Sequence, residues 1–172
     1  MTKTEENLKK AFAGESQARN KYDYFAKVAR KEGYHYIARI LEETALNEKQ
    51  HAKDEFKLLN GIGSTVDNLK AAIEGEHYEN TEMYPGMQKD AEEEGNDMAA
   101  ELFKEISEVE EHHEERFKKL LEMVEKGTVW KRDKEIEWKC SQCGYVHKGT
   151  EPPEVCPSCK HPKEYYEPIG EF

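Results

Sequence analysis

The chain has 172 residues, 37% of them charged and 36% hydrophobic, which allows one medium-sized domain and a small appendage. Its net charge of -11 would repel phosphate backbones and anionic lipid, which argues against nucleic acid and membrane surfaces as partners. No apolar run reaches the roughly 18 residues of a membrane span, and the start MTKTEENLKK lacks the apolar core of a signal peptide, so we expect a cytoplasmic protein.

Glycines divide the first 127 residues into four segments of helical length. The breaks fall at Gly33, at residues 61–65 (GIGST), at Gly95 and at Gly127. Helix start signals accompany them, such as Thr2 three residues before Glu5. The loops at the first and third breaks are short and predict antiparallel helix pairs, whereas the second is longer and could cross over. We therefore predict an all-α four-helix bundle over residues 1–127, with each segment forming one helix of five turns or more.

Helical phase places a carboxylate in the middle of the apolar stripe of each segment. Glu15 holds this place in the first segment. In the second, Glu48 is followed three residues later by His51, so both side chains share one face. The fourth segment repeats this pair with Glu110 and His113. The sequence therefore predicts that two Glu-x-x-His pairs and one further glutamate point toward the core.

The third segment offers three glutamates at a spacing of three residues, and phase separates them. The stripe of this segment consists of Leu69, Ala72, Ile73, Asn80, Met83 and Met87. Glu76 lies at its centre, Glu79 about 60° away and Glu82 about 120° away. We assign the first two as inward ligands and the third to solvent. By the same reasoning His112 faces water.

Most helical glutamates simply face solvent, so a single one of these residues would indicate little. Four inward carboxylates are different, because a buried charge is costly unless it is paired or bound to metal. Five glutamates carry -5, which two ferrous ions with +4 reduce to -1. One Glu from each of two helices with Glu-x-x-His from the other two is the arrangement of ferritin-like di-iron proteins. The donor set suits iron or manganese, and zinc less clearly.

After Gly127 the composition changes. We predict a linker with strand character over residues 128–138 and a small metal-bound β domain over residues 139–172, which is rich in Cys, Pro, Gly and Tyr. Its four cysteines form two CxxC motifs that are twelve residues apart: Cys140, Cys143, Cys156 and Cys159. In a reducing compartment this spacing favours one tetrahedral metal site over disulfides. A zinc ribbon has the same spacing and remains an alternative.

The segments that carry these residues resemble rubrerythrin from end to end. They are AFAGESQARNKYDYF, EKQHAK, GEHYENTEMYPG, EEHHEERF and WKCSQCGYVHKGTEPPEVCPSCKHP. The resemblance implies a ferritin-like bundle followed by a rubredoxin-like domain, with two irons in the bundle and one iron on the four cysteines. The implied di-iron ligands are Glu15, Glu48, His51, Glu76, Glu79, Glu110 and His113.

The resemblance also implies roles for individual residues. Glu48 and Glu110 would bridge the two irons. One iron would exchange Glu79 for His51 on reduction. Tyr22 and Tyr84 match tyrosines that hydrogen-bond to ligand carboxylates, although ordinary amphipathic packing would also explain both.

The implied function is that of a non-haem di-iron peroxidase, which reduces hydrogen peroxide to water and protects against oxidative stress. Electrons would pass through the rubredoxin-like iron and come from an external donor, either rubredoxin or an NAD(P)H-dependent reductase. The family also implies a homodimer or a higher homo-oligomer. The loop KLLNGIGST is short for the family, which leaves open an exchange of helices between subunits. A ferritin-like ferroxidase, oxygen-reducing or iron-storage protein would use the same helices, but it would not need the cysteine domain. A pure electron carrier or a zinc-stapled structural protein would leave the inward glutamates unexplained.

Overall fold

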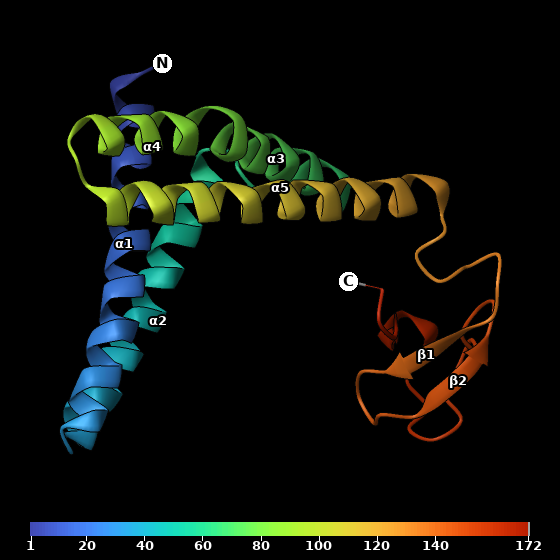
Figure 1. Cartoon of the computed structure of the whole chain (residues 1–172). Helices are drawn as coiled ribbons and strands as arrows, with labels where there is room; N and C mark the ends of the chain where they lie inside the picture. Colours follow the sequence, from blue (N-terminus) through green and yellow to red (C-terminus); the bar gives the residue numbers. More distant parts are fainter. Residues whose placement is uncertain (172) are drawn as a thin grey trace. The chain divides into compact units, whose positions relative to one another are not determined.

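The computed structural model describes residues 1–171 and contains two compact units, residues 1–63 and residues from 64 onward. The first is a helical hairpin, and the second combines helices with a small β domain (Figure 1). The predicted helical fold with a small C-terminal β domain is thereby confirmed. Within the described residues, every helix is too short or too polar to cross a membrane.

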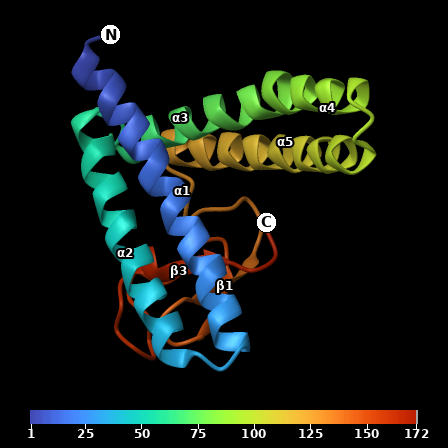
Figure 2. The ribbon, with the colours of Figure 1, turned by 90° about the vertical axis from the view of Figure 1, so that its left-hand side faces the viewer.

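The first unit consists of α1 (Lys3–Lys31) and α2 (His35–Leu58), which lie side by side as an antiparallel pair (Figure 2). The predicted capping box starts α1: the Thr2 hydroxyl accepts from the Glu5 amide at 3.2 Å, and the Glu5 carboxylate accepts from the Thr2 amide at 2.6 Å. Alanines form the buried contact near the hairpin loop: Ala26, Ala29 and Ala38. Their small side chains let the two helix backbones approach closely.

The chain folds back on itself where α2 ends. The Gly61 amide donates to the Phe56 carbonyl at 2.9 Å, and Asn60 adopts a left-handed conformation with φ of 55°. A Cβ on Gly61 would overlap the Phe56 ring, which itself stacks on Phe12 with ring centroids 4.8 Å apart. Only glycine fits this close approach, so the first residues after α2 are held against the helix and are not extended.

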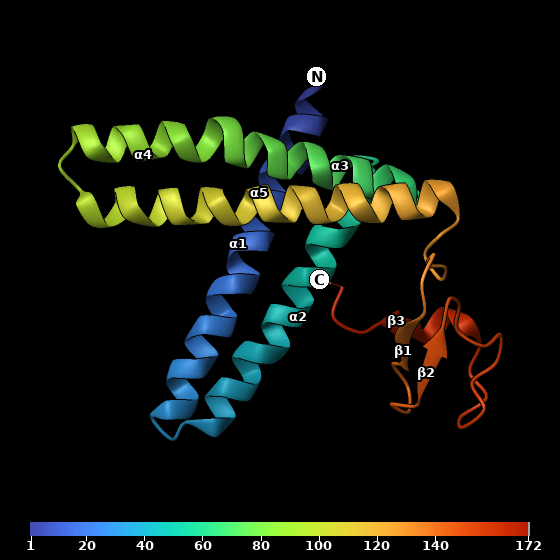
Figure 3. The same ribbon diagram turned by 45° about the vertical axis from the view of Figure 1, so that its right-hand side comes forward.

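The helical part of the second unit contains α3 (Thr65–Tyr78), η1 (Glu79–Met83), α4 (Tyr84–Glu93) and α5 (Asp97–Lys126). Both α3 and α4 run along α5 (Figure 3). Ser64 caps α3 in a box with Asp67, and the Asn96 side chain caps α5. The shorter helices α3 and α4 therefore both pack against the long helix α5.

The third segment is helical from Thr65 to Glu93, as predicted, but a π-helical turn, η1, interrupts its regular α-helical hydrogen bonding between α3 and α4. This turn ends two residues before Pro85, whose ring would clash with a carbonyl one α-turn earlier. The extra residue in the turn rotates the following helix by roughly 100° relative to a straight one. Met87, placed on the inner stripe by phase, is 40% exposed, while Ala91 is buried against α5.

The β domain is a three-stranded antiparallel sheet in the order β2-β1-β3. Its strands are β1 (Ile136–Cys140), β2 (Val146–Gly149) and β3 (Tyr166–Pro168), with a 3-10 turn, η2 (Lys163–Tyr165), before β3. The core consists of Trp138, Cys140, Cys156 and Tyr166. The first strand starts within the range predicted as a linker with strand character.

Arg132 ties the chain after α5 to this domain. Its guanidinium donates to the Thr128 carbonyl at 2.7 Å, pairs with Glu171 at 2.5 Å and lies over the Trp138 ring at 5.3 Å. A charge-assisted pair combined with a cation–π contact is a specific attachment. Part of the predicted linker is therefore ordered.

Candidate metal centres

The first carboxylate–histidine cluster lies within the α1–α2 hairpin. It joins Glu15 of α1 with Glu48 and His51 of α2, and its ligand atoms all lie within 4.8 Å of one another. His51 Nδ1 is 2.9 Å from a Glu48 oxygen and 3.7 Å from a Glu15 oxygen. The predicted i, i+3 pair thus meets the glutamate of the neighbouring helix on one face.

The two carboxylates of this cluster shift each other's pKa in opposite directions. A hydrogen bond to Glu48 raises the pKa of Glu15, while the same bond lowers the pKa of Glu48. The hydrogen bond with Glu48 also raises the pKa of His51, because it stabilises the imidazolium. Like charges at this distance are tolerated only with a proton or a cation between them, so the cluster has the electrostatics of a cation site.

The second cluster has the same construction within α3 and α5. It joins Glu76 with Glu110 and His113, again with all ligand atoms within 4.8 Å. His113 Nδ1 is 2.7 Å from Glu110 and 3.6 Å from Glu76. Burial, and then the hydrogen bond to Glu110, raises the pKa of Glu76. In both clusters an inward carboxyl is therefore driven toward its neutral form.

The two clusters form a structural repeat. In each, a glutamate on one helix faces a Glu-x-x-His pair on the antiparallel neighbour. Glu15 precedes Glu48 by 33 residues, and Glu76 precedes Glu110 by 34. Each hairpin supplies three candidate ligands, which is part of the set of seven that was predicted for two metals.

The neighbouring candidates differ in position. Glu79 is half-buried at the start of η1, but it is not among the clustered ligand atoms of the described residues. Glu82 and His112 are exposed. Tyr84 lies near the cluster, since burial and then the charge of Glu79 raise its pKa. Tyr22 is half-buried with its ring against Phe25 at 6.4 Å, and for both tyrosines a hydrogen bond to a ligand carboxylate stays a prediction.

Sequence analysis missed two acidic residues near the clusters. Glu55 has a buried carboxylate oxygen without a hydrogen-bond partner in the described chain, and its charge raises the pKa of Glu15. It follows Glu48 by seven residues, a spacing that would have revealed it. Glu114 is 6% exposed and ties α3 to α5 through His77 at 3.1 Å, with Lys118 at 2.5 Å as its second partner. The cross-helix contact has no local sequence signal.

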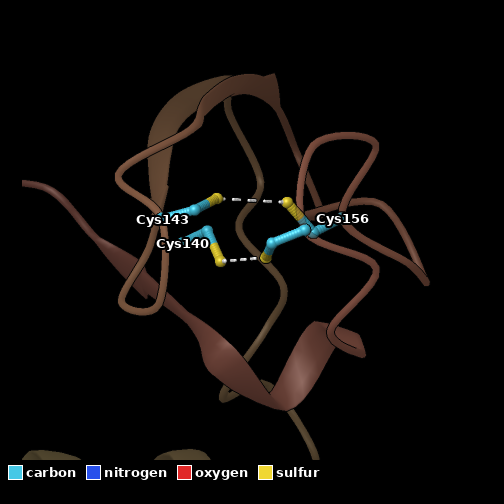
Figure 4. A group of neighbouring side chains, drawn as sticks. Cys140, Cys143 and Cys156 are labelled. Atoms are coloured by element: carbon cyan, nitrogen blue, oxygen red, sulfur yellow. Dashed lines mark hydrogen bonds between the residues drawn. The ribbon is translucent and has the colours of Figure 1, made fainter.

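The four cysteines meet at one point of the β domain, as predicted (Figure 4). Cys140 Sγ lies 3.6 Å from Cys159 Sγ, and Cys143 Sγ lies 3.7 Å from Cys156 Sγ. These separations are far longer than the roughly 2.05 Å of a disulfide. They match the edge of about 3.8 Å expected for a tetrahedron of sulfurs bound at about 2.3 Å to one metal. The thiols therefore fit a single tetrahedral ion.

Backbone amides stabilise the thiolate form of Cys143 and Cys156. The Tyr145 amide lowers the pKa of Cys143. For Cys156, burial opposes ionisation, but donors that include the amides of Cys159 and Ser158 lower its pKa to about 6. Donors at the sulfurs also influence the reduction potential of a bound iron.

The fold and the two kinds of site together define a class: a non-haem iron protein in which ferritin-like helices are joined to a rubredoxin-like domain. The family model described as rubrerythrin matches residues 6–121, and the one for the rubrerythrin rubredoxin-like domain matches residues 138–167. The chain belongs to the rubrerythrin family. Members are oxidoreductases with iron in both kinds of site, and the residues for both are present here.

Full-length relatives agree with this placement. The chain is 49% identical to a putative rubrerythrin of Methanocaldococcus jannaschii, with 97% of this chain and 93% of the relative covered. It is 48% identical to the rubrerythrin of Porphyromonas gingivalis, with coverages of 98% and 90%. Among solved structures, fully reduced, all-ferrous nigerythrin is 36% identical, with coverages of 98% and 87% and a TM-score of 0.38.

Proposed function

We propose that this protein is a cytoplasmic di-iron peroxidase that reduces hydrogen peroxide to water and draws its electrons through its own four-cysteine iron. The observation that carries the proposal is the presence of both sites in one chain: two carboxylate–histidine clusters and a tetrahedral set of thiols. The four free cysteines are consistent with a reducing compartment. In this proposal residues 1–127 supply the bundle, 128–138 the linker and 139–172 the electron-transfer domain.

The proposed di-iron ligands are the two clusters together with Glu79, and Glu48 and Glu110 are the bridging carboxylates. Five carboxylates and two imidazoles leave two divalent ions close to neutral, which permits burial. The place of Glu79 at a π-helical turn supports its role, because such turns often occur at functional sites. We propose that Glu79 and His51 alternate as ligands of one iron.

A bound pair of ferrous ions would supply the two electrons that, with two protons, convert hydrogen peroxide to two molecules of water. The carboxylates would hold the ions together with both histidines, whose Nδ1 atoms lie 2.9 Å and 2.7 Å from oxygens of Glu48 and Glu110. A one-electron centre on the four cysteines must then deliver two electrons for each peroxide. An external donor, either rubredoxin or an NAD(P)H-dependent reductase, refills it.

We further propose a homodimer in which helices are exchanged. A ferritin-like bundle has one long crossover connection, whose helices run parallel. Only residues 59–64, between α2 and α3, can provide it, because the other helix connections are residues 32–34 and 94–96. Whether one chain can close the bundle therefore depends on the reach of six residues.

That reach is too short. In a closed bundle, Glu48 and Glu76 would lie at the same height along the bundle axis. From that height α2 continues for about 15 Å beyond Glu48, and α3 begins about 16 Å before Glu76. The connection must cover about 31 Å, whereas seven extended steps reach about 25 Å. The turn that holds Gly61 against Phe56 shortens it further. We therefore propose that the α1–α2 hairpin of one chain completes the site with α3–α5 of another.

The peroxidase proposal is tested by separating peroxide reduction from electron supply. Cys156→Ser with Cys159→Ser should prevent assembly of the four-cysteine iron, because hydroxyl is a poor ligand for this site. Chemically pre-reduced, the variant should still consume about one peroxide per di-iron site in a rapid single turnover. Continuous turnover with a reductase should collapse.

The control is the parent protein, which should be red when oxidised and carry close to three irons per chain. Continuous turnover of the variant at the parent rate would contradict the proposed relay. Failure of the first turnover with both irons bound would contradict the peroxidase itself.

A further inference from the structure

The two CxxC motifs of the β domain end in turns of the same construction. The Gly144 amide donates to the Cys140 carbonyl at 2.8 Å, and the Lys160 amide donates to the Cys156 carbonyl at 3.0 Å. The residue after the second cysteine is left-handed in both turns, with φ of 76° for Gly144 and 64° for Lys160. Glycine adopts this conformation freely, whereas a lysine in it is strained. The second turn therefore carries a lysine where its backbone favours glycine.

The side chain of Lys160 bonds back to its own turn, where its Nζ donates to the Pro157 carbonyl at 2.9 Å. Three other lysines that follow α5 are each paired with a carboxylate within 3.5 Å: Lys131, Lys139 and Lys163. Lys160 forms no ion pair with any residue that the structure describes. A positive charge without a carboxylate partner is thus held against the turn that supplies Cys156 and Cys159.

We propose that the Lys160 ammonium raises the reduction potential of the iron bound to the four cysteines. Four thiolates carry -4, so a ferric ion leaves -1 and a ferrous ion leaves -2. A fixed positive charge stabilises the more negative ferrous state more strongly, and net charge is one of the factors that set such potentials. Lys160 acts from outside the ligand set and is not a catalytic residue. The inference rests on the proposed occupancy of this site by iron.

The strained backbone supports a role for this side chain. A residue in a sparsely populated conformation persists where the surrounding structure holds it, and such residues gather at functional sites. Glycine at position 160 would remove the strain together with the charge, as Gly144 already does in the first turn. Lys160→Gly should therefore fold at least as well as the parent, so that its potential can be measured.

The test is the midpoint potential of Lys160→Gly in the full-length protein, read at low salt from the visible thiolate-to-iron absorption in a redox titration. The substitution should make the iron about two to five times harder to reduce, which for one electron is about 18 to 41 mV. Lys160→Arg keeps the positive charge and should keep the parent potential. The pair of variants separates the charge from the identity of the side chain.

The matched control is Lys148→Gln, which removes the same charge elsewhere in the domain. Lys148 is exposed and lies on β2 opposite Glu137 of β1, outside both turns, so this variant should stay close to the parent potential. Salt gives a second readout, because Lys160 is also exposed. Between about 0.01 M and 1 M salt the screening length falls from about 30 Å to about 3 Å, so the difference between the parent and Lys160→Gly should shrink.

An unchanged or higher potential in Lys160→Gly would overturn the inference. An equal fall in Lys148→Gln would also overturn it, as would a fall that Lys160→Arg shares or that high salt leaves undiminished. Reduced loading would not obscure the result, because the absorption arises only from loaded sites. The parent protein distinguishes the two proposals: a parent without the red iron chromophore refutes the proposed function, whereas a red parent with a potential equal to that of Lys160→Gly refutes only the role of Lys160.

Discussion

At the scale of single residues, direction matters more than chemical type. Glu76 and Glu82 lie six residues apart in one segment, yet the first meets Glu110 and His113 while the second is exposed. His112 and His113 are neighbours, and only the second lies in a cluster. The backbone alone decides which of two identical side chains can reach a metal.

We expect Glu76→Ala and His113→Ala to lose iron from the helical site, with iron affinity lower by more than about 100-fold. Loss of a residue that only hydrogen-bonds to a metal ligand costs about 10- to 100-fold, and loss of the ligand itself should cost more. Glu82→Ala and His112→Ala are the matched controls and should bind iron like the parent. The iron content of each variant is measured after gel filtration. A full site in Glu76→Ala together with an empty one in Glu82→Ala would contradict the ligand assignment on this helix.

At the scale of elements, helix ends and turns set the register of the ligands. The π-helical turn η1 stands between Glu76 and the second half of its segment, so the residues that face α5 change phase there. The start of α3 is fixed by Ser64, whose hydroxyl accepts from the Asp67 amide at 3.2 Å. The Asp67 carboxylate accepts in return from the Ser64 amide at 3.0 Å.

This capping box predicts a pH-dependent contribution to the stability of α3. The Ser64 hydroxyl, and then its amide, lowers the pKa of Asp67 below the ordinary value of 3.8. A lowered folded-state pKa stabilises the fold above pH 3.8, and this contribution is lost as the pH falls through the folded-state value. Asp67→Asn should therefore melt at a lower temperature than the parent at pH 6, and the difference should shrink below pH 3.8. A difference that is constant with pH would contradict the role of the charge.

At the scale of the whole molecule, each hairpin carries one cluster of three proposed ligands, and Glu79 adds a fourth to the second hairpin. Helix exchange predicts complementation between two defective chains. Glu48→Ala damages only the first cluster, and Glu110→Ala damages only the second. In an exchanged heterodimer of these variants, one site combines both defects and the other has none.

Co-expressed and purified through two different tags, this heterodimer should bind half as much bundle iron as the parent dimer and show about half of its peroxidase activity. Each homodimer alone should be nearly inactive. Without exchange of helices, every site in the heterodimer keeps one defect. A heterodimer as inactive as the homodimers would therefore refute helix exchange. Inserting about 15 flexible residues after Gly63 should permit closure within one chain, whereas the same insertion at Gly95 should leave the dimer unchanged.

The sequence alone was enough to identify the candidate metal ligands and most of the helices. Phase at 3.6 residues per turn is a local property, so it identified the two Glu-x-x-His pairs, Glu15 and Glu76, and the CxxC spacing identified the thiolate site. Only the fold revealed the π-helical turn before Pro85, the contact of Glu114 with His77 and the burial of Tyr166 in the core that contains Cys156. These features depend on which surfaces meet across distant segments, and periodicity along the chain carries no information about that.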